Sequence, residues 1–188
     1  MKPQIITKED IKKCLPPCPR KPLDASRPDG YKRTVLFSDA DYAMFSERFL
    51  TQDGFSKFKK WLSFCGMDST AGQKQHWRRN YDCDNLAESY KAYMSLLHAR
   101  ANPLSFTESF KRGKENETKA EGVAVGVVYF KIKAKGSTSH HAINMAITKG
   151  LRNELTAIYI EPNGAGKINL TKKEKESIWY VNFSLNIA

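Results

Sequence analysis

Apolar residues in the first half of the chain recur at the spacing of amphipathic helices. A helix is predicted directly after residues 38–41, which can cap it, because aromatic positions then repeat at helical intervals. These positions are Tyr42, Phe45 and Phe49. A second helix is predicted over residues 55–64, and a third over residues 82–99. The third carries a continuous apolar stripe made of Leu86, Ala87, Tyr90, Tyr93, Met94 and Leu97.

The pattern changes to short apolar and alternating segments in the second half, which is typical of strands. Four strands are predicted: Val123–Lys131, Ala142–Thr148, Leu155–Glu161 and Ile178–Leu185. Short connections without long helices between them favour antiparallel pairing. We therefore expect an α+β fold in which N-terminal helices pack on an antiparallel sheet.

Residues 1–33 differ from the rest because they are rich in proline and basic residues. They predict an extended arm with one short helix at most, around Lys8–Lys13. Residues 34–188 are then expected to form a single domain. The arm could wrap over this domain or contact a protein partner.

The 188 residues carry a formal net charge of +11. Such a charge allows binding to nucleic acid, an anionic membrane surface or an acidic partner. The basic residues are spread along the whole chain, so a solvated basic surface is the simpler interpretation. No apolar run is long enough to span a membrane, and residues 1–13 lack the apolar stretch of a secretory signal. We expect a cytoplasmic protein with reduced cysteines.

Cys14 and Cys18 flank a Leu-Pro-Pro segment. They could form a disulfide or half of a metal site, or they could be two unrelated thiols in a loop. Cys65 falls on the apolar side of the second predicted helix, so we expect it to be a buried thiol.

Cys83 is the cysteine whose surroundings best suit a reactive thiolate. Asp82 is a good N-cap residue, which places Cys83 in the first turn of the third helix. The positive end of the helix dipole favours a thiolate there. Asp84, on the other side, complicates this interpretation, because two carboxylates disfavour a nearby thiolate unless they are capped, paired or bound to a cation. Asp82 and Asp84 could instead be metal ligands, with calcium as the natural hard ion.

Two later residues could complete a site with this thiol. His141 directly precedes the strand predicted at residues 142–148, where it could take the thiol proton, while His140 would point to the opposite side. Glu161 ends the next strand and could orient the imidazole. Each residue also has an ordinary structural interpretation, as a helix cap, a small first-turn residue or a local hydrogen-bonding group.

Three segments resemble the papain-like C-terminal domain of the Marasmius oreades agglutinin family, which includes bacterial and phage proteins. They are Tyr81–Ala87, His141–Asn144 and Ile160–Asn163. The resemblance covers about residues 75–185, and the final segments 166–168 and 178–181 look like the last strands of that family. The sugar-binding domain of the agglutinin is absent, so no lectin activity is implied.

The resemblance implies a papain-like fold and a cysteine protease with Cys83 as nucleophile, His141 as base and Glu161 as orienting residue. It also makes calcium a candidate cofactor, although the thiol chemistry itself requires none. Papain-like enzymes usually place a glutamine a few residues before the cysteine to stabilise the oxyanion. Trp77 stands near that place here, which leaves Gln75, further upstream, as the candidate donor.

We therefore hypothesise a thiol hydrolase, a cysteine peptidase that acts by acyl transfer on a protein or peptide. A second hypothesis is a noncatalytic interaction protein of phage or mobile-element type on the same fold, with residues 1–33 contacting the partner. A third is a nucleic-acid-binding protein that uses the basic surface.

Overall fold

The computed structural model describes residues 4–17, 33–65, 67, 82–101, 122–134, 137–164 and 166–184. Its centre is a six-stranded sheet with the order β2-β9-β5-β6-β7-β8. The strands are β2 (Thr34–Leu36), β5 (Val125–Ala134), β6 (Ser137–Lys149), β7 (Leu155–Glu161), β8 (Gly166–Ile168) and β9 (Tyr180–Asn182). The protein is therefore α+β, as predicted.

The expectation of a purely antiparallel sheet was wrong at one edge. Strands β9, β5, β6, β7 and β8 pair antiparallel, whereas β2 pairs parallel to β9. Strand β2 comes from a part of the chain far from β9, so no short connection restricts the pair to the antiparallel arrangement. The sheet is mixed for this reason.

A second, three-stranded sheet contains β1 (Gln4–Thr7), β3 (Asp41–Met44) and β4 (Gly122–Val123). The helix predicted directly after residues 38–41 was wrong, because β3 occupies this segment between β1 and β4. Tyr42 and Ala43 are fully buried, so successive side chains on both faces of the strand are covered. A short apolar run buried on both faces cannot be told from a helix by its spacing alone.

Two predicted helices near the N-terminus are confirmed. Helix α1 (Lys8–Cys14) begins at a capping box between Thr7 and Asp10, and helix α2 (Gly54–Phe64) follows the π-helical turn η1 (Phe49–Asp53). Ile11 of α1 is fully buried and belongs to the core of the large sheet. The described part of the expected arm therefore packs into the main core.

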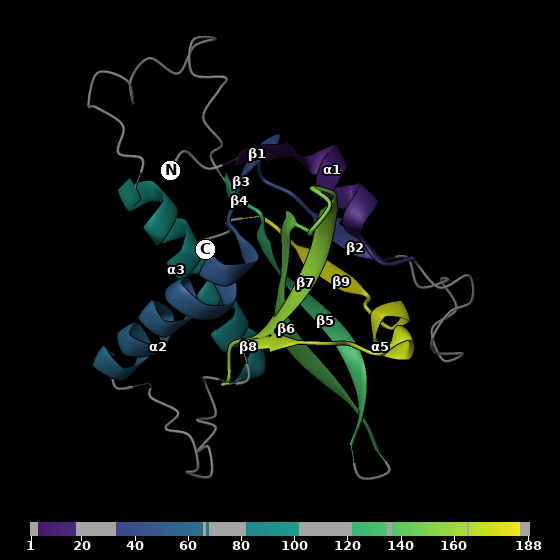
Figure 1. Ribbon diagram of the computed structural model, residues 1–188. Helices are drawn as coiled ribbons and strands as arrows, with labels where there is room; N and C mark the ends of the chain where they lie inside the picture. The colour runs from purple at the N-terminus through teal and green to yellow at the C-terminus, as the bar shows by residue number, and fades with distance from the viewer. Residues whose placement is uncertain are drawn as a thin grey trace.

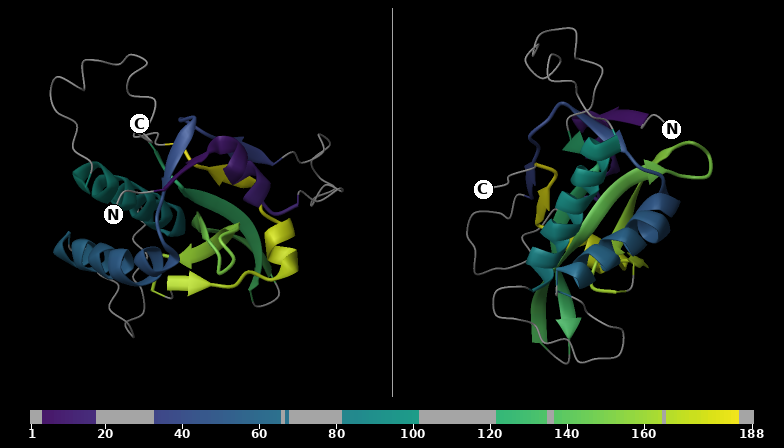
Figure 2. Two further views of the ribbon diagram at one scale, coloured as in Figure 1. Left: turned by 45° about the horizontal axis from the view of Figure 1, so that its top comes forward. Right: turned by 90° about the vertical axis from the view of Figure 1, so that its left-hand side faces the viewer.

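Helices cover both sides of the large sheet (Figures 1 and 2). Helices α2 and α3 (Cys83–Ala101) lie together on one side, and α1 and the short α5 (Lys172–Glu176) lie on the other. The apolar cluster under α2 and α3 includes Leu86, Tyr90, Met94, Val125, Ala146, Ile158 and Ile160. The cluster on the opposite side includes Ile11, Val128, Phe130, Ile143, Met145 and Ile147. This packing holds the start of α3 against the middle of the sheet.

Candidate functional site

Cys83 is the first residue of α3, as the sequence predicts. The carbonyl of Asp82 accepts the first helical hydrogen bond from the N–H of Leu86 at 3.0 Å, and the Asn85 side chain accepts from the N–H of Asp82 at 3.3 Å. The predicted stripe is buried at Leu86, Tyr90 and Met94, whereas Leu97 is only half-buried. Burial of this stripe against the sheet fixes the helix that carries the thiol.

His141 and Glu161 lie on neighbouring strands of the large sheet. The β6–β7 register pairs Asn144 with Ile160, and its continuation places Glu161 beside Ile143. His141 lies two residues further along β6, and so on the same face. The Nε2 atom of His141 is 2.5 Å from the Oε2 atom of Glu161. Both side chains are mostly buried, at 21% and 17% exposed, so solvent screens this pair weakly.

The pKa of the same histidine also depends on Cys83. Hydrogen bonding to Cys83 and then to Glu161 raises the pKa of His141 from 6.5 to about 9, against the opposite effect of burial. The raised pKa favours the imidazolium form of His141 at neutral pH, with Cys83 and the Glu161 carboxylate as its two polar neighbours.

His140 is placed differently from His141. Its side chain is exposed and its ring lies edge-on to Trp179, with the ring centres 6.0 Å apart. Successive residues of a strand face opposite sides of the sheet, which separates the two histidines. It is His141 that Glu161 binds and whose pKa Cys83 and Glu161 both raise.

Asp82 and Asp84 form an acidic pair beside the thiol. A hydrogen bond with Asp84, followed by burial and by the charge of Asp84, raises the pKa of Asp82. Calcium takes about six to eight oxygen ligands. In the described part of the chain, no group of three or more His, Cys, Asp or Glu side chains is arranged to hold a metal. These two carboxylates alone do not make up a calcium site.

The remaining predicted residues have mixed outcomes. Cys65 is exposed, so the expectation of a buried thiol was wrong; it follows the last turn of α2, where the apolar side no longer packs. Cys14 is a half-buried free thiol whose pKa is raised by burial. Gln75 and Cys18 lie outside the described residues.

Two neighbours of the histidine were missed from sequence. Phe130 is paired with His141 across β5 and β6, and its ring meets the imidazole edge-on, with centres 5.8 Å apart. The backbone N–H of Asn163 donates to Oε1 of Glu161 at 3.1 Å, which fixes the second carboxylate oxygen. Apolar alternation along β5 could have indicated Phe130, but only the register places it against the histidine.

Comparison with protein-family models, with curated proteins and with solved structures finds no match for this chain. Among the described residues, no helix is both long and apolar enough to cross a membrane. The interpretation of the site therefore depends on its own geometry and charge.

Proposed function

We propose that the protein is a thiol hydrolase of papain-like type, a cysteine peptidase with Cys83 as nucleophile. One observation carries this proposal: Glu161 binds Nε2 of His141, the histidine whose pKa is raised most by hydrogen bonding to Cys83. A thiol, a base and a group that orients the base are the parts that thiol-based acyl transfer requires. The cytoplasm is proposed as the place of action.

In the proposed resting state the thiol proton has already passed to His141, so that Cys83 and His141 form a thiolate and imidazolium ion pair. The Sγ atom of Cys83 attacks the carbonyl carbon of a peptide bond, and the imidazolium gives its proton to the leaving amine as the C–N bond breaks. A water molecule then attacks the thioester with His141 as base. The acid product leaves and the thiol is restored.

Negative charge on the substrate oxygen needs donors during both attacks. The N–H groups of the first helical turn are not used by hydrogen bonds within the helix. Cys83 begins α3, so its own N–H is the donor proposed here. Gln75 is proposed as the second donor, and Asp82 and Asp84 could contribute to a calcium site only with further ligands.

Turnover of an unfolded protein substrate tests the proposal. The parent should release peptides, and Cys83→Ala should abolish turnover while it preserves the thermal melt. Cys65→Ala is the matched control, because Cys65 is an exposed thiol at the other helix and should not be required. Turnover that survives Cys83→Ala would refute the proposal. If the parent cleaves nothing, the noncatalytic interaction protein becomes the better hypothesis. If the parent binds nucleic acid and this binding weakens steeply with salt, the nucleic-acid-binding protein becomes the better one.

A further inference from the structure

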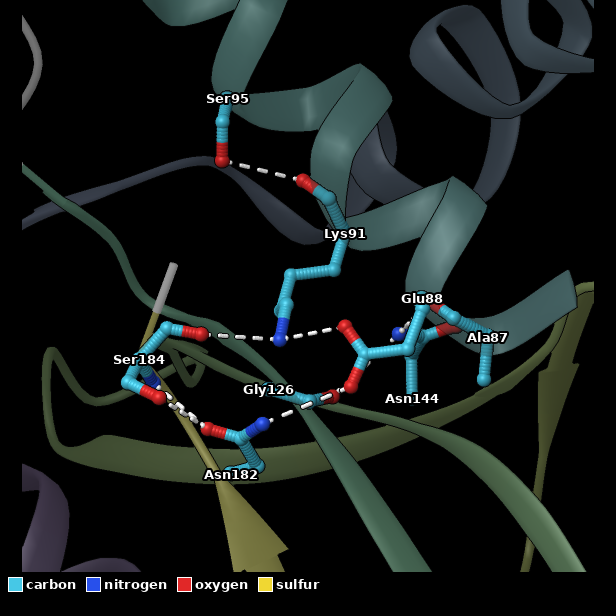
Figure 3. Close-up of polar contacts among 8 residues, drawn as sticks. All are labelled: Ala87, Glu88, Lys91, Ser95, Gly126, Asn144, Asn182 and Ser184. Carbon is cyan, nitrogen blue, oxygen red and sulfur yellow. Dashed lines mark hydrogen bonds and ion pairs between the residues drawn. The ribbon is translucent and has the colours of Figure 1, made fainter. Parts of the chain in front are cut away.

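A buried asparagine joins the strand of His141 to the helix of Cys83. Asn144 lies three residues after His141 on β6 and is fully buried. Its Nδ2 atom donates to the carbonyl of Ala87 on α3 at 2.8 Å and to the carbonyl of Gly126 on β5 at 3.3 Å (Figure 3). One side chain therefore contacts three elements at their common interface.

The geometry makes this contact local to the site. Ala87 lies one helical turn after Cys83, about 6 Å along the axis, and Asn144 lies about 10 Å along the strand from His141. Ala87 and Ala142 pack in one small cluster with Cys83. Small side chains there let the helix approach the strand closely enough for the amide to reach the Ala87 carbonyl.

The side-chain amide of Asn144 is costly to bury, and filling space in the core does not require a polar group. The Oδ1 atom of Asn144 is buried and has no hydrogen-bond partner among the described residues. A buried unsatisfied acceptor costs about 1–3 kcal/mol. A leucine of similar shape would fill the same space without that cost, so stability alone does not explain an asparagine at this position.

We infer that Asn144 is a positioning residue that sets the distance between the Cys83 thiol and the His141 imidazole by fixing α3 against β6. This inference rests on the proposed function, because it concerns the same thiol and imidazole. Without the amide donor, α3 would be held near its start by apolar contacts, which are not directional, and by the long 3.4 Å hydrogen bond from Asn182 to the flexible side chain of Glu88. A displacement of about 1 Å in a reacting pair can cost roughly a hundredfold in rate.

A second buried anchor on the same helix provides the control. Lys91 is 3% exposed, and its Nζ atom donates to the carbonyl of Ser184 at 2.9 Å and pairs with Glu88 at 2.5 Å (Figure 3). It lies two turns after Cys83, about 12 Å away along the helix. Lys91→Met also removes a buried polar anchor of α3, but at a distance from the thiol.

The experiment measures alkylation of individual cysteines by iodoacetamide between pH 6 and pH 9, together with the NMR titration of His141. The full chain is used, and the exposed Cys65 is the internal reference. Asn144→Leu should lower the labelling rate of Cys83 by about ten- to a hundredfold relative to the parent. The titration midpoint of His141 should fall from about 9 towards 6.5. Lys91→Met should leave the labelling rate of Cys83 within about twofold of the parent and the titration midpoint of His141 unchanged.

The outcomes separate the two proposals. If Cys83 of the parent reacts no faster than Cys65, the thiol is not activated, and the proposed function and the role of Asn144 are both refuted. If the parent thiol is activated and Asn144→Leu keeps the rate, the pH profile and the His141 midpoint, only the positioning role is overturned. The same holds if Lys91→Met causes an equal loss. If Asn144→Leu does not fold, Asn144→Ser is compared with Lys91→Met in the same way. The serine side chain is too short to reach the Ala87 carbonyl, so it also removes the hydrogen bond.

Discussion

The Nε2 atom of His141 lies 2.5 Å from Oε2 of Glu161, although the two residues are twenty positions apart in sequence. Antiparallel pairing of β6 with β7 brings them together, and the N–H of Asn163 fixes the other carboxylate oxygen. Because both carboxylate oxygens have a partner, the imidazole that the carboxylate binds has a fixed orientation. The hydrogen bond to Cys83 then sets the charge of the imidazole together with Glu161.

The first prediction concerns stability against pH. The pKa of His141 in the folded protein, about 9, lies above its ordinary value of 6.5. The stabilisation from the imidazolium is therefore fully present below pH 6.5 and is lost as the pH rises to about 9. We expect up to about 3 kcal/mol, reduced by partial screening. Urea unfolding at pH 6 and pH 9 measures the loss, and Glu161→Gln should show a smaller one. An equal loss in this variant would contradict the role of the pair.

The second prediction concerns the contact between α3 and η1. The hydroxyl of Tyr90 donates to the carbonyl of Leu50 at 2.6 Å, and both residues are fully buried. Tyr90→Phe removes the donor and leaves a buried carbonyl, so the free energy of unfolding should fall by about 1–2 kcal/mol. Tyr93→Phe, on the half-buried side of the same helix, is the control and should change stability less in denaturant unfolding. No loss in Tyr90→Phe would mean that the hydrogen bond contributes nothing net.

The third prediction tests whether residues 4–17 belong to the core. Ile11 of α1 is fully buried in the cluster that also contains Ile143 and Met145. Ile11→Ala should therefore cost about 2–5 kcal/mol of unfolding free energy. Lys12→Ala, which removes an exposed ion pair with Glu9, should cost less than about 1 kcal/mol. Equal, small effects would show that α1 is only loosely attached.

The positions of Cys83 and Glu161 on their elements were easier to predict than the fold around them. Helix α3 has both a local start signal at Asp82 and a long apolar stripe, so its existence and the place of Cys83 could be predicted from sequence. Strand β7 was predicted with its observed bounds, which put Glu161 at its end. These features depend on nearby residues, and such patterns are visible in a single sequence.

The rest depended on partners distant in sequence. Tyr42 and its neighbours have an apolar pattern that fits a helix, and only pairing with β1 and β4 makes them a strand. The parallel contact of β2 with β9 joins residues more than a hundred positions apart, for which no local signal exists. The contact of Asn144 with Ala87 is also invisible in sequence, because it depends on how closely α3 approaches the sheet.

The fourth prediction concerns calcium. The Asp82 and Asp84 carboxylates beside the thiol interact with each other, and the described residues contain no group of three or more His, Cys, Asp or Glu side chains arranged to hold a metal. We expect turnover to persist in the presence of a calcium chelator, with less than a twofold change. Asp84→Asn should likewise leave the response to added calcium unchanged. Loss of turnover in chelator, restored by calcium, would show that other ligands complete a calcium site.

The fifth prediction separates the roles of the three site residues. Cys83→Ala should abolish turnover, and His141→Ala should be nearly as damaging, because the thiolate and its proton acceptor act as one unit. Glu161→Gln should be milder, with about a ten- to a hundredfold loss, since the amide keeps a hydrogen-bonding shape but not the charge. Glu154→Gln provides the matched control, because it removes the same charge just before the opposite end of β7, where the side chain is exposed.

The dependence of kcat/KM on pH makes this last comparison specific. The alkaline limit of activity should lie near pH 9 in the parent, where the His141 imidazolium loses its proton. Glu161 raises the pKa of His141, so Glu161→Gln should move the alkaline limit to lower pH, while Glu154→Gln should leave it in place. A variant that loses rate with an unchanged pH profile would show that Glu161 does not act through the imidazole. An alkaline limit that moves equally in both variants would mean that the effect is one of overall charge, because the two substitutions change it by the same amount.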